Sequence, residues 1–193
     1  MKKKSMEPVT GKVFERIASG DFDTSAGVYE GCRFVQCNFA QAGFSGLVFR
    51  ECAFEQCDLS MARLAGASLQ EVRFSGCKLL GVQFGECRKL LLEMSFERCM
   101  MRLAVFAGLD LKNTRFSGCD LQEADFTDTN LVGALFDDCD LRLAIFFHAN
   151  LEKADFRTAF NFSIPPESNR LKKAKFSLHG LPGLLDGYGI EIE

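Results

Sequence analysis

The sequence is poor in several features on which common protein classes depend. Its 193 residues include no Trp, two Tyr, two His and four Pro. No stretch approaches the roughly 18 consecutive apolar residues of a membrane-spanning helix. The first residues, MKKKSMEPVTGK, are positively charged but are not followed by an apolar run, so we expect no signal peptide and a cytoplasmic location. A net charge of −3 argues against a basic protein that binds nucleic acid directly.

Motifs for catalysis are also missing. The sequence has no Gly-rich phosphate loop, no nucleophile elbow and no HExxH motif. Of the two histidines, His148 follows a large apolar residue by two positions, and we expect it at the surface. We therefore predict a protein that is not an enzyme, with no catalytic residues and no cofactor.

The sequence is rich in phenylalanine, with 20 copies, and its large apolar residues recur every five residues. The stretch DLQEADFTDTNLVGALFDDCDL places a large apolar residue at 121, 126, 131, 136 and 141. A helix would spread these residues around its whole circumference, and a strand would point them to alternating faces. The pattern becomes intelligible only if the chain turns a corner every five residues.

Two runs of these large residues divide the chain. The first runs from Tyr29 to Phe84 and the second from Phe96 to Phe156, with a twelve-residue step between them. Phe96, Phe116, Phe136 and Phe156 also recur every twenty residues. Twenty residues make four five-residue sides, which predicts a four-cornered coil stacked at about 4.8 Å per turn. Within each side the large residue and the one two positions earlier point inward, while the residue between them points outward. A leucine-rich repeat or a β-helix with longer turns lacks this five-residue period.

The nine cysteines fit the same rule. All except Cys87 lie two residues before a large residue, where Ala stands in other repeats. Because there is no CxxC pair and no His beside them, we expect buried free thiols and no metal site.

The breaks in the pattern suggest how the chain is divided. We predict an N-terminal cap at 1–26, with Phe14, Ile17 and Phe22 as its apolar part, and β-helix sections at 27–84 and 96–160. A spacer at 85–95 lies between them, and Leu90–Leu92 there are expected to fill the core, the alternative being a projecting loop. A Pro-containing turn and last coil side follow at 161–177. A C-terminal cap at 178–193 is predicted to contain a short amphipathic helix and a strand at GIEIE.

Runs such as ADFTD, TNLVG, CDLRL, ANLEK and ADFRT resemble the pentapeptide-repeat family. The resemblance covers about residues 27–177. It implies an all-β fold, a right-handed quadrilateral β-helix, whose length here we estimate as a little over six turns.

Seven acidic residues, with no Lys or Arg among them, lie between Ser117 and Asp140: Asp120, Glu123, Asp125, Asp128, Asp137, Asp138 and Asp140. On the four-sided coil they would occupy three adjoining faces. They could serve only as a solubilising surface, or they could form an anionic surface for a basic protein groove of the kind that holds nucleic acid. Leu143, Ile145 and Phe147 could form an exposed apolar patch nearby.

Within the family, CKLLGVQF, SFERC and the tail SNRLKKAKFSL…GLLDGYGIEIE are similar to segments of bacterial topoisomerase-interacting members, namely the quinolone-resistance, microcin-immunity and albicidin-immunity proteins. This resemblance implies a homodimer joined through Leu181, Leu184, Leu185 and Ile190. It also implies a DNA-mimicking contact with DNA gyrase through the acidic residues. The net charge and the lack of a long apolar run predict no direct nucleic-acid binding and no membrane contact. The sequence departs from the drug-protecting members, which carry projecting loop insertions, since Tyr29 to Phe84 has none. The alternative is a general protein-interaction scaffold with a different partner.

Overall fold

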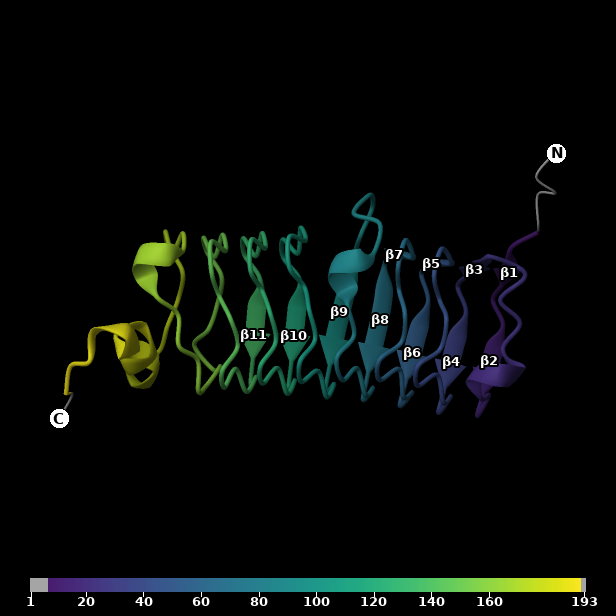
Figure 1. Cartoon of the computed structure of the whole chain (residues 1–193), viewed down its shortest axis with the longest axis horizontal. Helices are drawn as coiled ribbons and strands as arrows, with labels where there is room; N and C mark the ends of the chain where they lie inside the picture. Colours follow the sequence, from purple (N-terminus) through teal and green to yellow (C-terminus); the bar gives the residue numbers. More distant parts are fainter. Residues whose placement is uncertain (1–6, 192–193) are drawn as a thin grey trace.

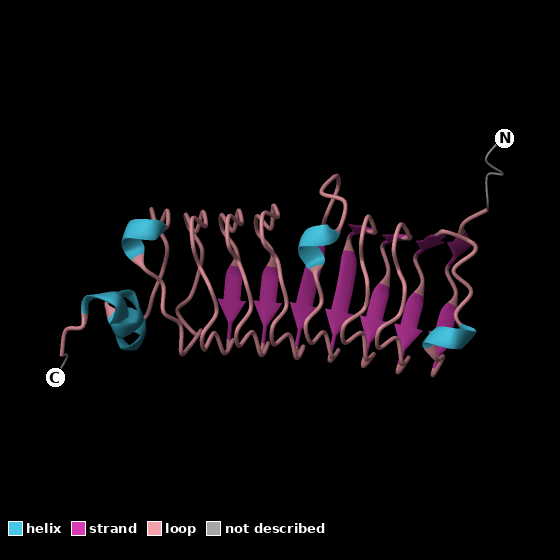
Figure 2. Cartoon of the chain, in the orientation of Figure 1, coloured by secondary structure: helices cyan, strands magenta, loops and turns pink. Residues whose placement is uncertain are grey.

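The computed structural model describes residues 7–191 and shows a long rod of stacked rungs (Figure 1). Short strands and 3-10 helices alternate with turns in the described part of the chain, and none of its helices is long and apolar enough to cross a membrane (Figure 2). The strands are β1 (Val9–Thr10), β2 (Val13–Glu15), β3 (Val28–Glu30), β4 (Arg33–Val35), β5 (Val48–Arg50), β6 (Ala53–Glu55), β7 (Ser68–Gln70), β8 (Val72–Ser75), β9 (Met94–Glu97), β10 (Arg115–Ser117) and β11 (Leu135–Asp137). The 3-10 helices are η1 (Ser19–Asp21), η2 (Phe84–Glu86), η3 (Pro166–Ser168), η4 (Leu178–Leu184) and η5 (Asp186–Tyr188).

All strand pairs are parallel and join successive rungs. One sheet runs in the order β2-β4-β6-β8-β9-β10-β11, and a second runs β1-β3-β5-β7. Phe116 lies opposite Phe96 on one side and Phe136 on the other, a register of twenty residues. Isolated bridges such as Val105↔Asp125 continue the same register on the sides that lack named strands. The predicted all-β class and four-sided solenoid are confirmed.

We number the four sides of the coil by their inward-pointing large residues. Face 1 is the seven-stranded sheet, from Phe14 through Phe116 to Phe176, and face 2 carries Phe39 through Leu121 to Leu141. Face 3 carries Phe44 through Phe106 to Phe146, and face 4, which includes the second sheet, carries Tyr29 through Leu69 and then Leu111 to Leu151. Every large residue of the two predicted runs is buried.

Aromatic rings stack along the rod axis in these columns. Phe116 lies 5.2 Å from Phe96 and 5.0 Å from Phe136 between ring centroids, with the ring planes nearly parallel. On face 1 the stacking continues without a break through nine rings: Phe14, Phe34, Phe54, Phe74, Phe96, Phe116, Phe136, Phe156 and Phe176. Rings of neighbouring faces meet edge to face, as Phe106 and Phe116 do at 5.8 Å. Offset stacks and edge-to-face pairs both stabilise aromatic cores.

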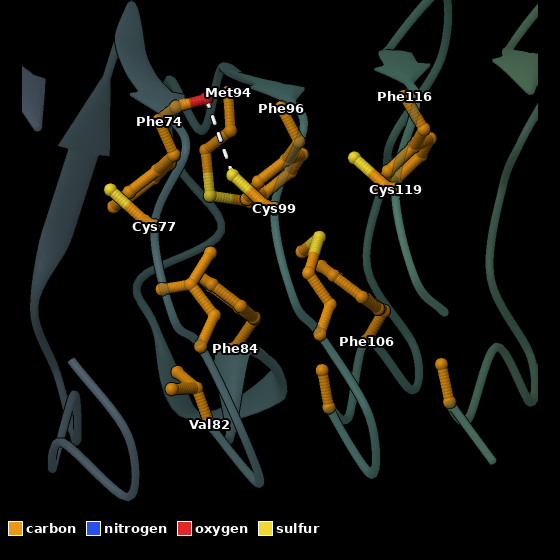
Figure 3. Packing of buried hydrophobic residues seen from close by; sticks show 14 of the residues in the cluster. Phe74, Cys77, Val82, Phe84, Met94, Phe96, Cys99, Phe106, Phe116 and Cys119 are labelled. Carbon is orange, nitrogen blue, oxygen red and sulfur yellow. Dashed lines mark hydrogen bonds between the residues drawn. The ribbon is translucent and has the colours of Figure 1, made fainter. Parts of the chain in front are cut away.

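The cysteines lie inside the coil, all free and all buried, as predicted. Cys77 and Cys99 stand beside the Phe74 and Phe96 rings, and the Cys99 thiol donates a hydrogen bond to the Phe74 carbonyl oxygen at 3.5 Å (Figure 3). Thr129 fills an equivalent position on another side and donates in the same way to Phe106 at 3.1 Å. Burial raises the pKa of Cys52 to about 11 and that of Cys87 to about 12, so both thiols stay protonated at neutral pH.

The N-terminal residues extend the coil rather than forming a separate unit over it. β1 pairs with β3 and β2 pairs with β4, so residues 9–15 lie in the regular register. Phe22 is buried and its ring packs against those of Tyr29 and Phe39, while Phe14 and Ile17 pack against the core from its edge. Phe14, Ile17 and Phe22 therefore cover the N-terminal end of the core, and they belong to an additional rung of the coil.

The spacer does not fill the core in the way we expected. Leu90 and Leu91 are 78% and 68% exposed, in a loop between η2 and β9 that projects beyond the neighbouring rungs (Figure 2). Only Leu92 packs against the core. Met94 occupies an inward position that small residues hold in most other rungs and is itself buried, and we attribute the loop to the volume that it takes. The projecting-loop alternative is correct for the first two leucines.

At the other end the chain leaves the coil at 161–168 and then returns to it. Phe162 and Ile164 stay buried, and Arg170 and Lys175 pair with the preceding rung, so Phe176 stacks on Phe156 at 5.3 Å. The expected C-terminal helix is present as the 3-10 helix η4, but Gly189–Glu191 form no strand. Gly189 adopts a φ of +60°, which turns the chain out of an extended course. The remainder of the predicted GIEIE strand lies outside the described residues.

Candidate functional site

The seven acidic residues singled out in the sequence come together on two successive rungs. We call them the acidic belt: Asp120, Glu123, Asp125, Asp128, Asp137, Asp138 and Asp140. Asp120 lies opposite Asp140 on face 2, and Asp125 lies on face 3 between Val105 and Ile145. Asp137 ends β11 on face 1, with Asp138 directly after it at the corner. The belt therefore wraps around three adjoining faces of the rod.

Three members of the belt have a structural role that the sequence interpretation missed. The Oδ1 atoms of Asp120, Asp125 and Asp140 each accept a hydrogen bond from the backbone N–H two residues later, at 3.2, 2.8 and 3.1 Å. Asn130, Asn150 and Asp155 make the same turn-forming bond elsewhere in the rod. Such side-chain bonds favour turns in general. The sequence shows an Asp or Asn directly before many of the large residues. This recurring position could have predicted the turn-forming role.

The other four members of the belt are held more loosely. Glu123 lies 3.3 Å from Arg102, and Asp128 lies 3.6 Å from His148, both as exposed pairs. Asp137 accepts hydrogen bonds from the hydroxyls of Ser117 and Thr158 at 3.3 and 2.9 Å. Asp138 is exposed. Because exposed ion pairs contribute little, about 0–1 kcal/mol, these carboxylates can exchange partners at small cost.

Exposed apolar side chains border the belt on face 3. Leu143, Ile145 and Phe147 are all exposed, as the sequence suggested, and they occupy the rung after Glu123, Asp125 and Asp128. Leu103, also exposed, occupies the rung before and was not singled out from the sequence. The sequence could have indicated it, because Leu103 lies twenty residues before Glu123 and forty before Leu143.

The four residues assigned to dimerisation divide into two pairs. Leu181 and Ile190 are 41% and 54% exposed, whereas Leu184 and Leu185 are half-buried and Leu184 packs against the core. The cap is fixed to the rod by a hydrogen bond from the Ile164 N–H to the Gly183 carbonyl oxygen at 2.8 Å. Gly180 and Gly183 approach the Phe162 ring so closely that a Cβ at either position would collide with it. One side of the cap is thus attached to the rod, and Leu178, Leu181, Tyr188 and Ile190 remain exposed.

Inside the coil there is little space for a ligand. An internal cavity lined by Phe44, Phe54, Leu64 and neighbouring side chains measures about 10 Å³, about the volume of one water-sized probe. The described residues contain no cluster of three or more His, Cys, Asp or Glu side chains placed to hold a metal ion. A groove of about 650 Å³ crosses the outside of face 1 between β6 and β9, where Arg73, Glu97 and Arg98 line it.

Comparison with solved structures finds rods of the same kind. A trypsin-treated form of QnrB1, described as a plasmid-mediated fluoroquinolone resistance protein, is 20% identical over 96% of this chain and 97% of its own, with a TM-score of 0.46. HetL, a pentapeptide repeat protein involved in heterocyst differentiation regulation from the cyanobacterium Nostoc sp. strain PCC 7120, is 17% identical over 91% of this chain and 86% of its own, with a TM-score of 0.50. At such identities the likeness concerns the fold alone. None of the curated proteins matches this sequence.

The family comparison covers the same part of the chain as the repeat. A model described as "Pentapeptide repeat region" matches residues 29–93 and 89–159, which is well over half of the 193 residues. These matches contain both runs of inward-pointing large residues and the spacer between them. The chain belongs to the pentapeptide-repeat family.

Proposed function

We propose that this protein is a non-enzymatic, homodimeric binding scaffold whose acidic belt occupies a protein groove built for duplex DNA, and that DNA gyrase is the partner. The observation that carries this proposal is the belt itself, seven carboxylates on three adjoining faces of two rungs with no Lys or Arg between Ser117 and Asp140. A basic groove that holds DNA attracts such a surface and rejects neutral ones.

The sequence resemblance to topoisomerase-interacting family members supports gyrase as the partner. Their role in immunity to antibiotics or toxins is the role that we propose here. The drug-protecting family members carry projecting loops, and the loop at Leu90 and Leu91 can be compared with these. Tyr29 to Phe84 carries no projecting insertion, but this loop on face 4 is a short counterpart of one.

A DNA supercoiling assay with purified gyrase tests the proposal. We expect the wild-type protein at micromolar concentration to inhibit supercoiling, or to relieve poisoning by a quinolone. The combined variant Glu123→Gln, Asp128→Asn and Asp138→Asn should lose about tenfold or more in potency, because it removes three charges and spares the turn-forming bonds of Asp120, Asp125 and Asp140.

A matched control removes three exposed acids from other rungs, in the variant Glu15→Gln, Glu51→Gln and Glu71→Gln. It should behave like the wild type. If the wild type neither inhibits gyrase nor relieves poisoning, gyrase is not the partner and the general scaffold becomes the better description. If the control loses as much potency as the belt variant, only overall net charge matters.

The proposed dimer uses the exposed side of the C-terminal cap, where an end-to-end contact with a second copy would bury Leu181 and Ile190. Such an isologous contact is the commonest way for soluble chains to associate. Sedimentation equilibrium should give a dimer for the wild type and a monomer for Leu181→Glu with Ile190→Glu. The control, Met61→Glu with Leu80→Glu, changes two exposed residues elsewhere and should remain dimeric. A wild-type monomer at micromolar concentration would contradict the dimer.

A further inference from the structure

Face 3 differs from the other two faces that the acidic belt covers. On face 2 the acids Asp120 and Asp140 occupy the same position on neighbouring rungs. On face 3 the carboxylates are confined to one rung, which carries Glu123, Asp125 and Asp128. The rungs on either side place Leu103 and Leu143 beside Glu123, and Val105 and Ile145 beside Asp125. Asp128 instead lies between Gly108 and His148, and Phe147 lies beside Thr127.

The backbone bonds fix this three-row arrangement. Val105 pairs with Asp125, which pairs with Ile145, and the Phe126 N–H donates to the Ile145 carbonyl oxygen at 2.9 Å. At the next corner the Asp128 N–H donates to the Phe147 carbonyl oxygen, also at 2.9 Å. The rows are therefore held by the rigid coil and do not depend on flexible loops.

The apolar rows are exposed although neighbouring surface positions are polar. Leu143 is 70% exposed, and Leu103, Ile145 and Phe147 are exposed as well, while Val105 is half-buried. Single exposed apolar residues are ordinary on a protein surface. Leu103 with Val105 on one rung, and Leu143, Ile145 and Phe147 on the other, lie on either side of Glu123 and Asp125, and apolar residues gathered in this way mark an interaction surface.

We infer that face 3 of the acidic belt docks a protein element that presents Lys or Arg side chains flanked on both sides by apolar side chains, across a width that one α-helix can cover. The dimensions agree, because three rows span two strand spacings, about 9.6 Å, and a helix with its side chains is about 10–12 Å across. The phosphate backbone of duplex DNA has no counterpart of the apolar rows. This inference rests on the proposed function, and it adds that the same partner is recognised by apolar contact and not by charge alone.

Two kinds of contact respond differently to salt. Attraction between exposed charges weakens as ionic strength rises, whereas burial of apolar surface does not. If face 3 docks its partner as inferred, removing the apolar row should weaken binding at every salt concentration. Removing the carboxylates should weaken binding mainly at low salt.

The test measures binding of the full chain to the DNA gyrase holoenzyme between 50 mM and 500 mM salt. The apolar variant is Leu143→Ser, Ile145→Ser and Phe147→Ser together, and its control is Val13→Ser, Met61→Ser and Leu80→Ser, which changes three comparably exposed residues outside the belt. We expect the apolar variant to lose about tenfold or more in affinity at both ends of the salt range, while the control binds as the wild type does. Circular dichroism melting establishes that both variants keep the fold.

The possible failures are distinct. If the apolar variant binds as tightly as the wild type while the belt variant does not, the inference is overturned and the proposed function stands. The inference is also overturned if the apolar variant and its control lose affinity equally. If wild-type protein does not bind gyrase at any salt concentration, the proposed function is overturned, and the inference with it.

Discussion

Faces 1 and 4 meet the same irregularity in the sequence and respond to it differently. On face 1 the sheet passes through the spacer without interruption, since β8 pairs with β9 and Phe74 stacks on Phe96 at 5.3 Å even though they are 22 residues apart. On face 4 the sheet ends at β7. The Arg88 N–H still bonds the Ala67 carbonyl oxygen and the Glu93 N–H that of Leu69, but the residues between them leave the wall.

The difference shows that one side of a rung can absorb two extra residues while the other three keep their register. Each rung contacts only its neighbours, so a local change need not propagate along a solenoid. What must be preserved is the inward residue of each side.

The largest effect is expected from placing a charge in a regular part of face 4. Leu131 is fully buried, so Leu131→Asp loses about 1.5–3 kcal/mol of apolar burial and in addition buries a carboxylate without a partner. We expect it to abolish cooperative folding at 25 °C, as seen by circular dichroism and urea unfolding. Leu91→Asp makes the same change on face 4 but in the projecting loop, outside the buried column, and it should leave the unfolding free energy within about 0.5 kcal/mol of wild type. Equal stability of the two variants would refute the inward placement of Leu131.

The aromatic column of face 1 gives the next largest effect. Phe116→Ala removes a ring that stacks on two others and meets Phe106 and Phe126 edge to face. Large-to-small changes of this kind cost about 3–5 kcal/mol, because a cavity remains. Urea unfolding measures this change in free energy. Phe147→Ala, at an exposed ring on face 3, serves as the control and should cost less than about 0.5 kcal/mol. A cost below about 1 kcal/mol for Phe116→Ala would mean that the column does not contribute to stability as described.

Deleting Lys89 and Leu90 should make face 4 regular. The shortened sequence Cys87-Arg88-Leu91 places a small, an outward and a large residue at the repeat positions, with Phe96 again five residues after Leu91. Burial of Leu91 would contribute about 1.5–3 kcal/mol, opposed by about 1–3 kcal/mol of crowding against Met94. We therefore expect the unfolding free energy to change by less than about 2 kcal/mol. The deletion should be more favourable in a Met94→Ala background, where the crowding is relieved.

The matched deletion removes Gln122 and Glu123 from a regular corner. It moves Phe126 on face 3 and the inward residues after it out of register, so severe destabilisation is expected in the same urea experiment. If both deletions cost the same, the spacer is no more tolerant than any other side. If the Met94→Ala background makes the Lys89–Leu90 deletion less favourable, the volume explanation for the loop is wrong.

These contrasts also show what the sequence could and could not determine. The column from Phe96 to Phe156 and the buried cysteines were predictable, because dozens of positions obey one spacing rule. The course of Leu90 and Leu91 was not, because a two-residue insertion can be buried or looped out, and the choice depends on the volume of Met94 in three dimensions. In the acidic belt, the number and sign of the charges were visible in the sequence. The turn-forming bonds of Asp120 and Asp140 are local, and the Asp before each large residue was their signal. The apolar residues beside Asp125 required the positions of neighbouring rungs.

The smallest predicted effect concerns an ion pair on face 1. The Asp155 carboxylate accepts two hydrogen bonds from the Arg157 guanidinium, at 2.9 and 2.7 Å, and lies 3.6 Å from the Lys175 ammonium. The bonds from Arg157 lower the pKa of Asp155 below its usual value. A lowered carboxyl pKa stabilises the fold above the pKa of the unfolded chain, about 3.9, and this contribution is lost as the pH falls through the lower folded value. Asp155→Asn removes the charge and one of the two accepting oxygens, so it should cost about 0.5–1 kcal/mol at pH 7. The cost should fall once Asp155 is protonated in both states, because the charge then no longer contributes. Urea unfolding of the two proteins from pH 7 to pH 2 measures the difference, and a gap that stays constant over this range would show that the charge of Asp155 does not stabilise face 1.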